Sequence, residues 1–135
     1  KVLLEKFDVQ TQRKTEFVPI TEKIQQIVKS NQIQSGICHI YVPHTTAGIT
    51  INENADPMVS QDILLIVDEI IPFVDHRYQH MEDNSAAHVK ACLFGSSESV
   101  IIEKGALVFG TWQGIFLCEF DGPRNRKIYA KILEG

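Results

Sequence analysis

Apolar residues alternate with polar ones along most of this chain, and in three places the spacing changes to that of a helix. Alternation predicts strands in the first part of the chain at residues 1–10, 14–20, 36–42 and 49–54. It predicts further strands in the last third at residues 99–103, 106–112, 115–121 and 126–133. We expect the first two strands to pair across Thr11-Gln12-Arg13, and we expect Gln113-Gly114 to form a turn.

Three segments place their apolar residues on one helical face, at residues 22–30, 57–71 and 85–94. The second begins at Asp56-Pro57, because aspartate caps free backbone N–H groups and proline is tolerated at the first helical position. The third begins at Asn84-Ser85 and ends at Gly95. Strands interspersed with helices predict an α+β fold in one domain over residues 1–135, with a large mixed, mainly antiparallel β-sheet and about three helices.

The composition is that of an ordinary globular protein. Of the 135 residues, 44% are apolar and 22% are charged, and the net charge is -4 with lysine and arginine scattered along the chain. This argues against nucleic-acid binding, which depends on clustered cations. No apolar run approaches the ~20 residues of a membrane span and no leader pattern opens the chain, so we expect a cytoplasmic protein without a membrane partner. We expect the cysteines to be reduced and buried at positions Cys38, Cys92 and Cys118.

The stretch YVPHTTAGITINENADP, at residues 41–57, carries more polar residues than a core strand needs. His44 is followed by two threonines and a glycine, which let a ligand approach the backbone and donate hydrogen bonds to an anion. A turn with a hydrogen-bonded histidine is the structural alternative. Glu53 is either an exposed carboxylate at the end of a strand or part of the same site, whereas helix capping accounts for Asp56.

The segment HMEDNSAAH, at residues 80–88, begins and ends with a histidine. The helix that starts within it presents free N–H groups and the positive end of a helix dipole, which favour a phosphate or a carboxylate. Glu82 and Asp83 are candidates to bind a metal or to accept a proton. If His44 also converges on this segment, three histidines form an open site of the kind that binds Zn²⁺.

The last third of the chain holds further polar positions in apolar surroundings. Glu119 lies in an apolar strand and needs a partner if it is buried, because an unpaired buried carboxylate is costly. Arg124 is the nearest candidate for that partner. Trp112 and Gln113 either cover a hairpin turn or belong to the site.

Four sequence segments occur in this order along the chain: HTTAGITINENADP, AAHVK, GSSESV and GTWQGIFLCEFDGPR. Together they resemble the YjbQ-like family, also described as secondary thiamine-phosphate synthases, over nearly the whole chain. The resemblance implies an α+β domain assembled as a homotrimer, with sites where subunits meet. The family's motif positions correspond to His44, His80 and His88, to Glu53, Asn54 and Asp56, and to Trp112, Gln113, Glu119 and Arg124.

The activity associated with this family joins hydroxymethylpyrimidine diphosphate to thiazole phosphate and releases diphosphate, so we expect a small anionic, phosphorylated substrate. We predict catalytic roles for His44, Glu53 and His88. A divalent metal, Zn²⁺ or Mg²⁺, is expected at His44, His80 and His88, and no organic cofactor is expected. Substrate binding is assigned to Thr45, Thr46, Asn54, Asn84, Ser85, Trp112, Gln113 and Arg124.

Two other functions are compatible with the same residues. One is a metal-dependent hydrolase of a small phosphorylated metabolite, in which an open three-histidine site activates water. The other is a small-molecule-binding protein without turnover. Three histidines suit Zn²⁺ better than Mg²⁺, which prefers oxygen ligands, so the thiamine reaction is also interpreted as a secondary activity of the site.

Overall fold

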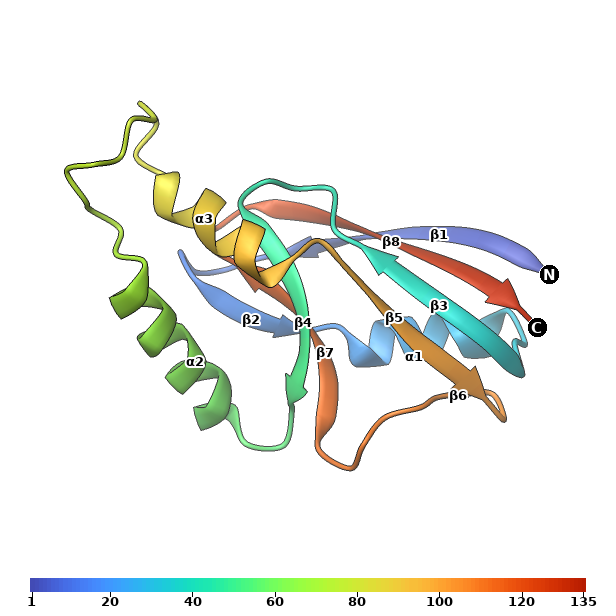
Figure 1. The fold of residues 1–135 in the computed structure, drawn as a ribbon. Coiled ribbons are helices and arrows are strands. Elements are labelled where there is room, and N and C mark those ends of the chain that lie inside the picture. The colour runs from blue at the N-terminus through green and yellow to red at the C-terminus, as the bar shows by residue number, and fades with distance from the viewer.

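The computed structural model describes residues 1–135 as two antiparallel sheets and three helices (Figure 1). The strands of the larger sheet are β1 (Val2–Gln10), β3 (Ser35–Tyr41), β5 (Ser97–Glu103), β6 (Ala106–Leu107) and β8 (Asn125–Glu134). The strands of the smaller sheet are β2 (Glu16–Pro19), β4 (Ala47–Glu53) and β7 (Gln113–Glu119). The helices are α1 (Thr21–Ser30), α2 (Pro57–Ile70) and α3 (Ser85–Phe94).

Every strand pair in both sheets is antiparallel, which confirms the predicted α+β fold. The larger sheet has the order β1-β8-β3-β5-β6 and the smaller one β2-β7-β4. The prediction that the first two strands pair is wrong, because β1 pairs with β8 and β2 pairs with β7 in the other sheet. Thr11 follows β1 and donates its N–H to the carbonyl of Arg124, and from there the chain crosses between the sheets.

The core lies between the two sheets and α1, which runs beneath the larger sheet (Figure 1). Helical spacing brings Ile24, Ile27 and Val28 of α1 onto one buried face. No helix covers the opposite face of the larger sheet, and the strand register places a row of exposed apolar side chains across it. The row consists of Val2, Leu133, Ile37, Ile101 and Val108.

Three local predictions need correction. The strand expected at residues 106–112 stops at Leu107, and Gln113 begins β7 instead of a turn. The turn lies just before it, where the N–H of Gln113 donates to the carbonyl of Gly110 and the N–H of Gly110 donates to the Gln113 side chain. Cys92 is exposed on α3 and not buried.

Helix α3 packs tightly against β4 because one residue of the strand has no side chain. A Cβ added at Gly48 would lie 2.9 Å from the carbonyl oxygen of Gly95 and 3.1 Å from the Cβ of Phe94. The N–H of Ile49 donates to that same Gly95 carbonyl at 3.1 Å. The end of α3 is therefore tied to the strand, which fixes the position of the helix beside the segment that carries His44.

Helix α2 packs against the molecule through partly buried apolar side chains, such as Leu64, and through one buried cation. Its start matches the prediction, since the Asp56 side chain accepts the N–H of Met58 at 2.9 Å, but none of its residues is fully buried. Lys90 of α3 is fully buried, its ammonium forms an ion pair with Asp68 of α2, and it lies 4.3 Å from the ring centroid of Phe73. The ammonium has no other ion-pair partner, so its charge depends on Asp68.

We expect the two partners of this ion pair to respond differently to substitution. Asp68→Asn should lower the free energy of unfolding by about 3 kcal/mol, because it leaves the buried ammonium without a counter-charge. Lys90→Met should change it by less than about 1 kcal/mol, because methionine fills the same apolar volume and Asp68 is partly solvated. Urea unfolding measures both changes, with Asp62→Asn on the exposed face of α2 as the control. A larger loss in Lys90→Met than in Asp68→Asn would contradict this account.

Candidate functional site

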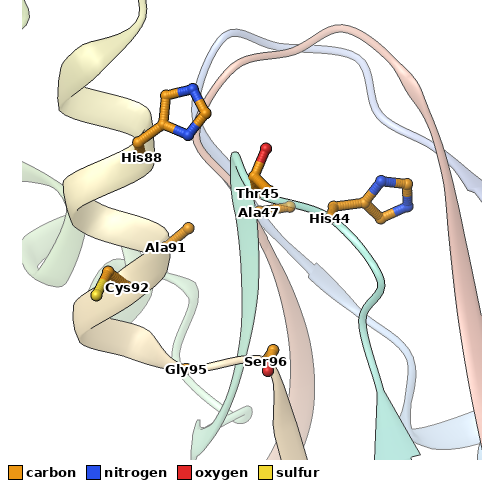
Figure 2. A pocket seen from close by; sticks show the side chains of 8 residues that line it. All are labelled: His44, Thr45, Ala47, His88, Ala91, Cys92, Gly95 and Ser96. Atoms are coloured by element: carbon orange, nitrogen blue, oxygen red, sulfur yellow. The ribbon is translucent and has the colours of Figure 1, made fainter.

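Two adjoining pockets lie between α3, the segment that leads into β4, and the connection from β7 to β8. The first has a volume of about 330 Å³ and is lined on one side by α3 and on the other by residues 44–47 (Figure 2). The second has a volume of about 350 Å³, and its wall is polar apart from Pro43. Both pockets are lined by His44, Thr45 and His88, so they form one continuous depression, the histidine cleft.

The His44 ring is anchored through one of its nitrogen atoms. Its Nε2 accepts the backbone N–H of Lys127 at 2.9 Å. Burial lowers the pKa of His44 and the charge of Arg126 lowers it further, so the neutral ring is favoured. In Figure 2 the rings of His44 and His88 lie on opposite sides of Thr45 and do not face each other.

The imidazole ring of His88 packs against that of His80. The two rings meet edge to face, with centroids 5.2 Å apart, and the Nε2 of His80 lies 3.7 Å from a carboxylate oxygen of Glu82. Nowhere in the chain do three His, Cys, Asp or Glu side chains gather closely enough to hold a metal ion. Since Nε2 of His44 is also engaged by a backbone donor, the three predicted histidines do not fit a shared metal site within one chain. No chemical step is therefore assigned to a metal here.

A buried ion pair forms the floor of the histidine cleft. Arg126 is 4% exposed and Glu119 is fully buried, and the guanidinium binds both carboxylate oxygens, with Nε to Oε1 at 2.8 Å. The predicted partner of Glu119, Arg124, is therefore wrong. The alternation of β8 turns Arg126 to the same inner face as Ile128, whereas Arg124 precedes the strand. Burial acts to raise the pKa of Glu119, but hydrogen bonds, first from Arg126, outweigh it and lower the pKa.

The same guanidinium holds the segment that carries the histidine. Arg126 donates to the carbonyl of Thr46 at 3.2 Å and to its hydroxyl at 2.9 Å. Thr46 is buried, whereas Thr45 is exposed in the wall of the cleft. Of the two predicted threonines, only Thr45 therefore has a hydroxyl without a protein partner that can meet a ligand.

Asp121 organises the other wall. Its carboxylate is 7% exposed and accepts hydrogen bonds from Lys14 at 2.8 Å, Asn84 at 3.0 Å and Arg124 at 2.9 Å. Burial alone would raise the pKa of Asp121, but these donors lower it to about 2. Asn84 is thus engaged with Asp121 and does not cap α3 with its side chain, and its Oδ1 is buried without a partner. The side chain of Arg124 remains 52% exposed and is open to a ligand.

Four predicted site residues lie at the far end of β4 and β7. The register pairs Ala47 with Glu119 beside the cleft and Glu53 with Gln113 at the opposite end, roughly 20 Å away along the strands. There the Glu53 carboxylate accepts the N–H groups of the two residues that precede α2. Asn54 and Trp112 lie beside it, joined by a backbone hydrogen bond of 2.8 Å. Within one chain these four residues do not reach the cleft. Ser85, at the start of α3, lines a separate pocket with His80.

Sequence reasoning missed three groups of the cleft: Arg126, Asp121 and the backbone N–H of Lys127. A signal for Arg126 was present, because β8 alternates and Arg126 stands in the same phase as Ile128 and Ala130. The pairing of Asp121 with residues far along the chain has no local signal. The Lys127 donor belongs to the main chain, so no residue type reports it.

The fold and the cleft define an α+β protein of two antiparallel sheets with a histidine-lined and arginine-lined depression at one end of the smaller sheet. The family model described as UPF0047 protein YjbQ-like matches residues 5–135, and the chain belongs to this family.

Relatives and solved structures agree with that assignment. The chain is 47% identical over 131 residues to UPF0047 protein YugU of Bacillus subtilis, covering 97% of this chain and 99% of the relative. A crystal structure of a YjbQ/UPF0047 protein from Clostridium acetobutylicum matches with a TM-score of 0.93 and 48% identity, covering 96% and 99% of the two chains. A YbjQ-like protein of Sulfolobus solfataricus matches with a TM-score of 0.94 and 39% identity, covering 100% and 99%. The names of these proteins give no reaction. No helix of the structure has the length and apolar character needed to cross a membrane.

The low pKa of Asp121 makes a pH-dependent contribution to stability. A pKa lowered from 3.8 to about 2 stabilises the folded state by about 2 kcal/mol at neutral pH. Because the folded-state pKa is depressed, the contribution is complete above the unfolded-state value and is lost as the pH falls toward about 2. We expect Asp121→Asn to be less stable than the wild type by about this amount at pH 7, with the difference shrinking below about pH 4.5. Urea unfolding across this range tests it, and a difference that stays constant down to about pH 2 would contradict it.

Proposed function

We propose that the histidine cleft binds the phosphate groups of a small metabolite and that the protein is a transferase of the thiamine-phosphate synthase type. The reaction joins hydroxymethylpyrimidine diphosphate to thiazole phosphate and releases diphosphate, as a main or a secondary activity. The proposal combines the family resemblance with one structural observation. That observation is the convergence of two arginines, two histidines and an asparagine on a pocket whose wall is polar apart from Pro43.

The charges around the cleft support binding of an anion. The carboxylate of Glu119 is paired with Arg126, and that of Asp121 accepts from Arg124, Lys14 and Asn84. The third carboxylate of this wall, Glu82, is 74% exposed to solvent and lies 3.7 Å from Nε2 of His80. Arg124 is half exposed and can still turn donors toward a ligand.

This arrangement suits departure of diphosphate better than activation of water by a metal. In the proposed reaction the thiazole nitrogen forms a bond to the pyrimidine methylene carbon while the carbon–oxygen bond to diphosphate breaks. Charge develops on the departing oxygen, where cations and fixed N–H donors lower the barrier. A cleft that also holds the two reactants in line adds the advantage of proximity. No residue is required to form a covalent intermediate.

His88 is the residue that best tests this function, because neither of its ring nitrogens has a hydrogen-bond partner in the protein and its ring borders both pockets. We expect His88→Ala to lower thiamine-phosphate formation at least about 100-fold, the effect of losing a positioned acid or base, with the melting temperature nearly unchanged. His76→Ala is the matched control, since that ring is exposed outside the cleft. Product is measured chromatographically, with Mg²⁺ in the buffer.

Other outcomes of this assay distinguish the alternatives. Unchanged turnover in His88→Ala would remove His88 from the mechanism. Hydrolysis of the diphosphate substrate without joining, abolished by chelator, would identify a hydrolase. No turnover in the wild type, combined with a rise in melting temperature on adding the substrates, would identify a binding protein, because a ligand of the folded state stabilises it.

We also propose that the bare face of the larger sheet is the surface through which the chain assembles as a homotrimer. The chain exposes 7925 Å², whereas a folded monomer of its mass, 15.3 kDa, is expected to expose about 7100 Å². Part of this additional exposed surface is apolar. The five apolar side chains that form the row across the larger sheet are 46–62% exposed. Apolar surface of this kind is typical of a subunit interface.

Assembly is tested by a charge placed in the middle of the row. Ile37 pairs with both Leu133 and Ile101, so Ile37→Lys should convert a trimer into monomers by burying an unpaired charge. Ile66→Lys is the control, because Ile66 is equally apolar and 50% exposed on α2. Light scattering coupled to size-exclusion chromatography reports the mass. A wild-type mass of one chain, or dissociation by Ile66→Lys alone, would contradict the assignment of this face.

A further inference from the structure

His44 lies where the pairing between β3 and β8 of the larger sheet stops. β3 pairs with β8 only as far as Tyr41, whose partner is Tyr129. Two residues before Tyr129, the N–H of Lys127 points to the same side of β8, where no strand remains to accept it. The ring of His44 fills this place and accepts that N–H through Nε2 at 2.9 Å.

This hydrogen bond determines where the proton of the neutral ring resides. A backbone N–H can only donate, so Nε2 of His44 must carry its lone pair. A neutral imidazole has one proton, which must then be on Nδ1. Nδ1 has no partner in the protein, and His44 borders both pockets of the histidine cleft. Burial and the nearby charge of Arg126 lower the pKa of His44 and so disfavour a second proton on the ring.

We infer that His44 serves the histidine cleft as a neutral hydrogen-bond donor, with its Nδ1–H directed to an oxygen atom of the ligand and its tautomer fixed by the backbone of Lys127. This inference rests on the proposed function for the identity of the ligand as an oxyanion. It changes the role predicted for His44, because a ring with Nδ1–H and an occupied Nε2 can neither bind a metal nor accept a proton.

The two histidines of the cleft differ in their hydrogen bonds. Neither ring nitrogen of His88 has a hydrogen-bond partner, and its ring packs edge to face on the ring of His80, with centroids 5.2 Å apart. His88 is therefore free to exchange a proton with a ligand, whereas His44 is committed to donation. Two histidines in one cleft thus have different tasks that their surroundings assign.

The tautomer is tested directly by nitrogen-15 NMR of the histidine rings in the ligand-free protein at neutral pH. We expect His44 to show a protonated Nδ1 and an unprotonated Nε2, and its signals to stay in place when one equivalent of Zn²⁺ is added. A protonated Nε2, or a shift of His44 Nδ1 on adding zinc, would overturn the inference. This measurement needs no substrate, so it remains decisive even if the proposed function fails.

The positioning role of the Lys127 backbone has its own pair of variants. Lys127→Pro removes the N–H, and it interrupts no sheet hydrogen bond, because this N–H goes to His44. We expect a mixture of His44 tautomers in it. Lys127→Ala keeps the N–H, loses only the exposed contact with Asp8, and should keep the single tautomer. A single Nδ1–H tautomer in folded Lys127→Pro would overturn the positioning role. If that variant does not fold, a protonated Nε2 in Lys127→Ala would overturn it equally.

Binding of inorganic diphosphate tests the donor itself. The amide nitrogen of asparagine occupies nearly the place of Nδ1, and the amide group of glutamine reaches nearly the place of Nε2. We expect His44→Gln to weaken diphosphate binding at least about tenfold, because it lacks the donor to a charged oxygen, and His44→Asn to weaken it much less. Calorimetric titration measures both. Equal loss in the two variants, or greater loss in His44→Asn, would overturn the donor role. Failure of the wild type to bind diphosphate, with the Nδ1–H tautomer confirmed by NMR, would instead contradict the proposed function.

Discussion

The ion pair between Arg126 and Glu119 joins the two sheets of this protein, and the cleft depends on it. Arg126 belongs to β8 in the larger sheet, and Glu119 belongs to β7 in the smaller one. Both charges are buried, so neither is tolerable without the other. Thr11 adds a hydrogen bond of 2.8 Å to the same carboxylate from the point where the chain crosses between the sheets. At the entrance to β4, the carbonyl and the hydroxyl of Thr46 accept further hydrogen bonds from Nη2 of the same guanidinium.

One strand thereby positions the His44 segment in two ways. The side chain of Arg126 holds Thr46 from the inner face of β8, and the backbone of the next residue holds His44 at the edge. Any shift of β8 would move both contacts together. A buried and fully paired polar group of this kind costs desolvation energy that apolar residues would avoid, but it specifies one arrangement of the loop. The packing of the two sheets therefore also determines the geometry of the cleft.

The sequence predicted what is local and missed what depends on distant partners. Alternation and capping located most strands and all three helices, because the signals lie within a few residues, as at Asp56. The pairing of β1 with β8 joins opposite ends of the chain, and no local pattern encodes it. For Glu119 the need for a cation was predictable from burial, and its choice of Arg126 over Arg124 followed from the phase of β8. The hydrogen bond to His44 from a backbone group was beyond residue patterns altogether.

The motif residues that resemble the family fall into two groups, and the fold keeps them apart. His44 and Glu53 stand at opposite ends of one strand, and a strand does not bend enough to bring its ends together. In the proposed trimer the contact between neighbours is head to tail, because a cyclic arrangement of three chains places unlike patches against each other. A surface near Glu53 on one chain can then meet a different surface on the next, which an isologous dimer contact does not require. A site completed between subunits, as the family resemblance implies, would require this kind of contact to bring the Glu53 end of one chain to the cleft of the next.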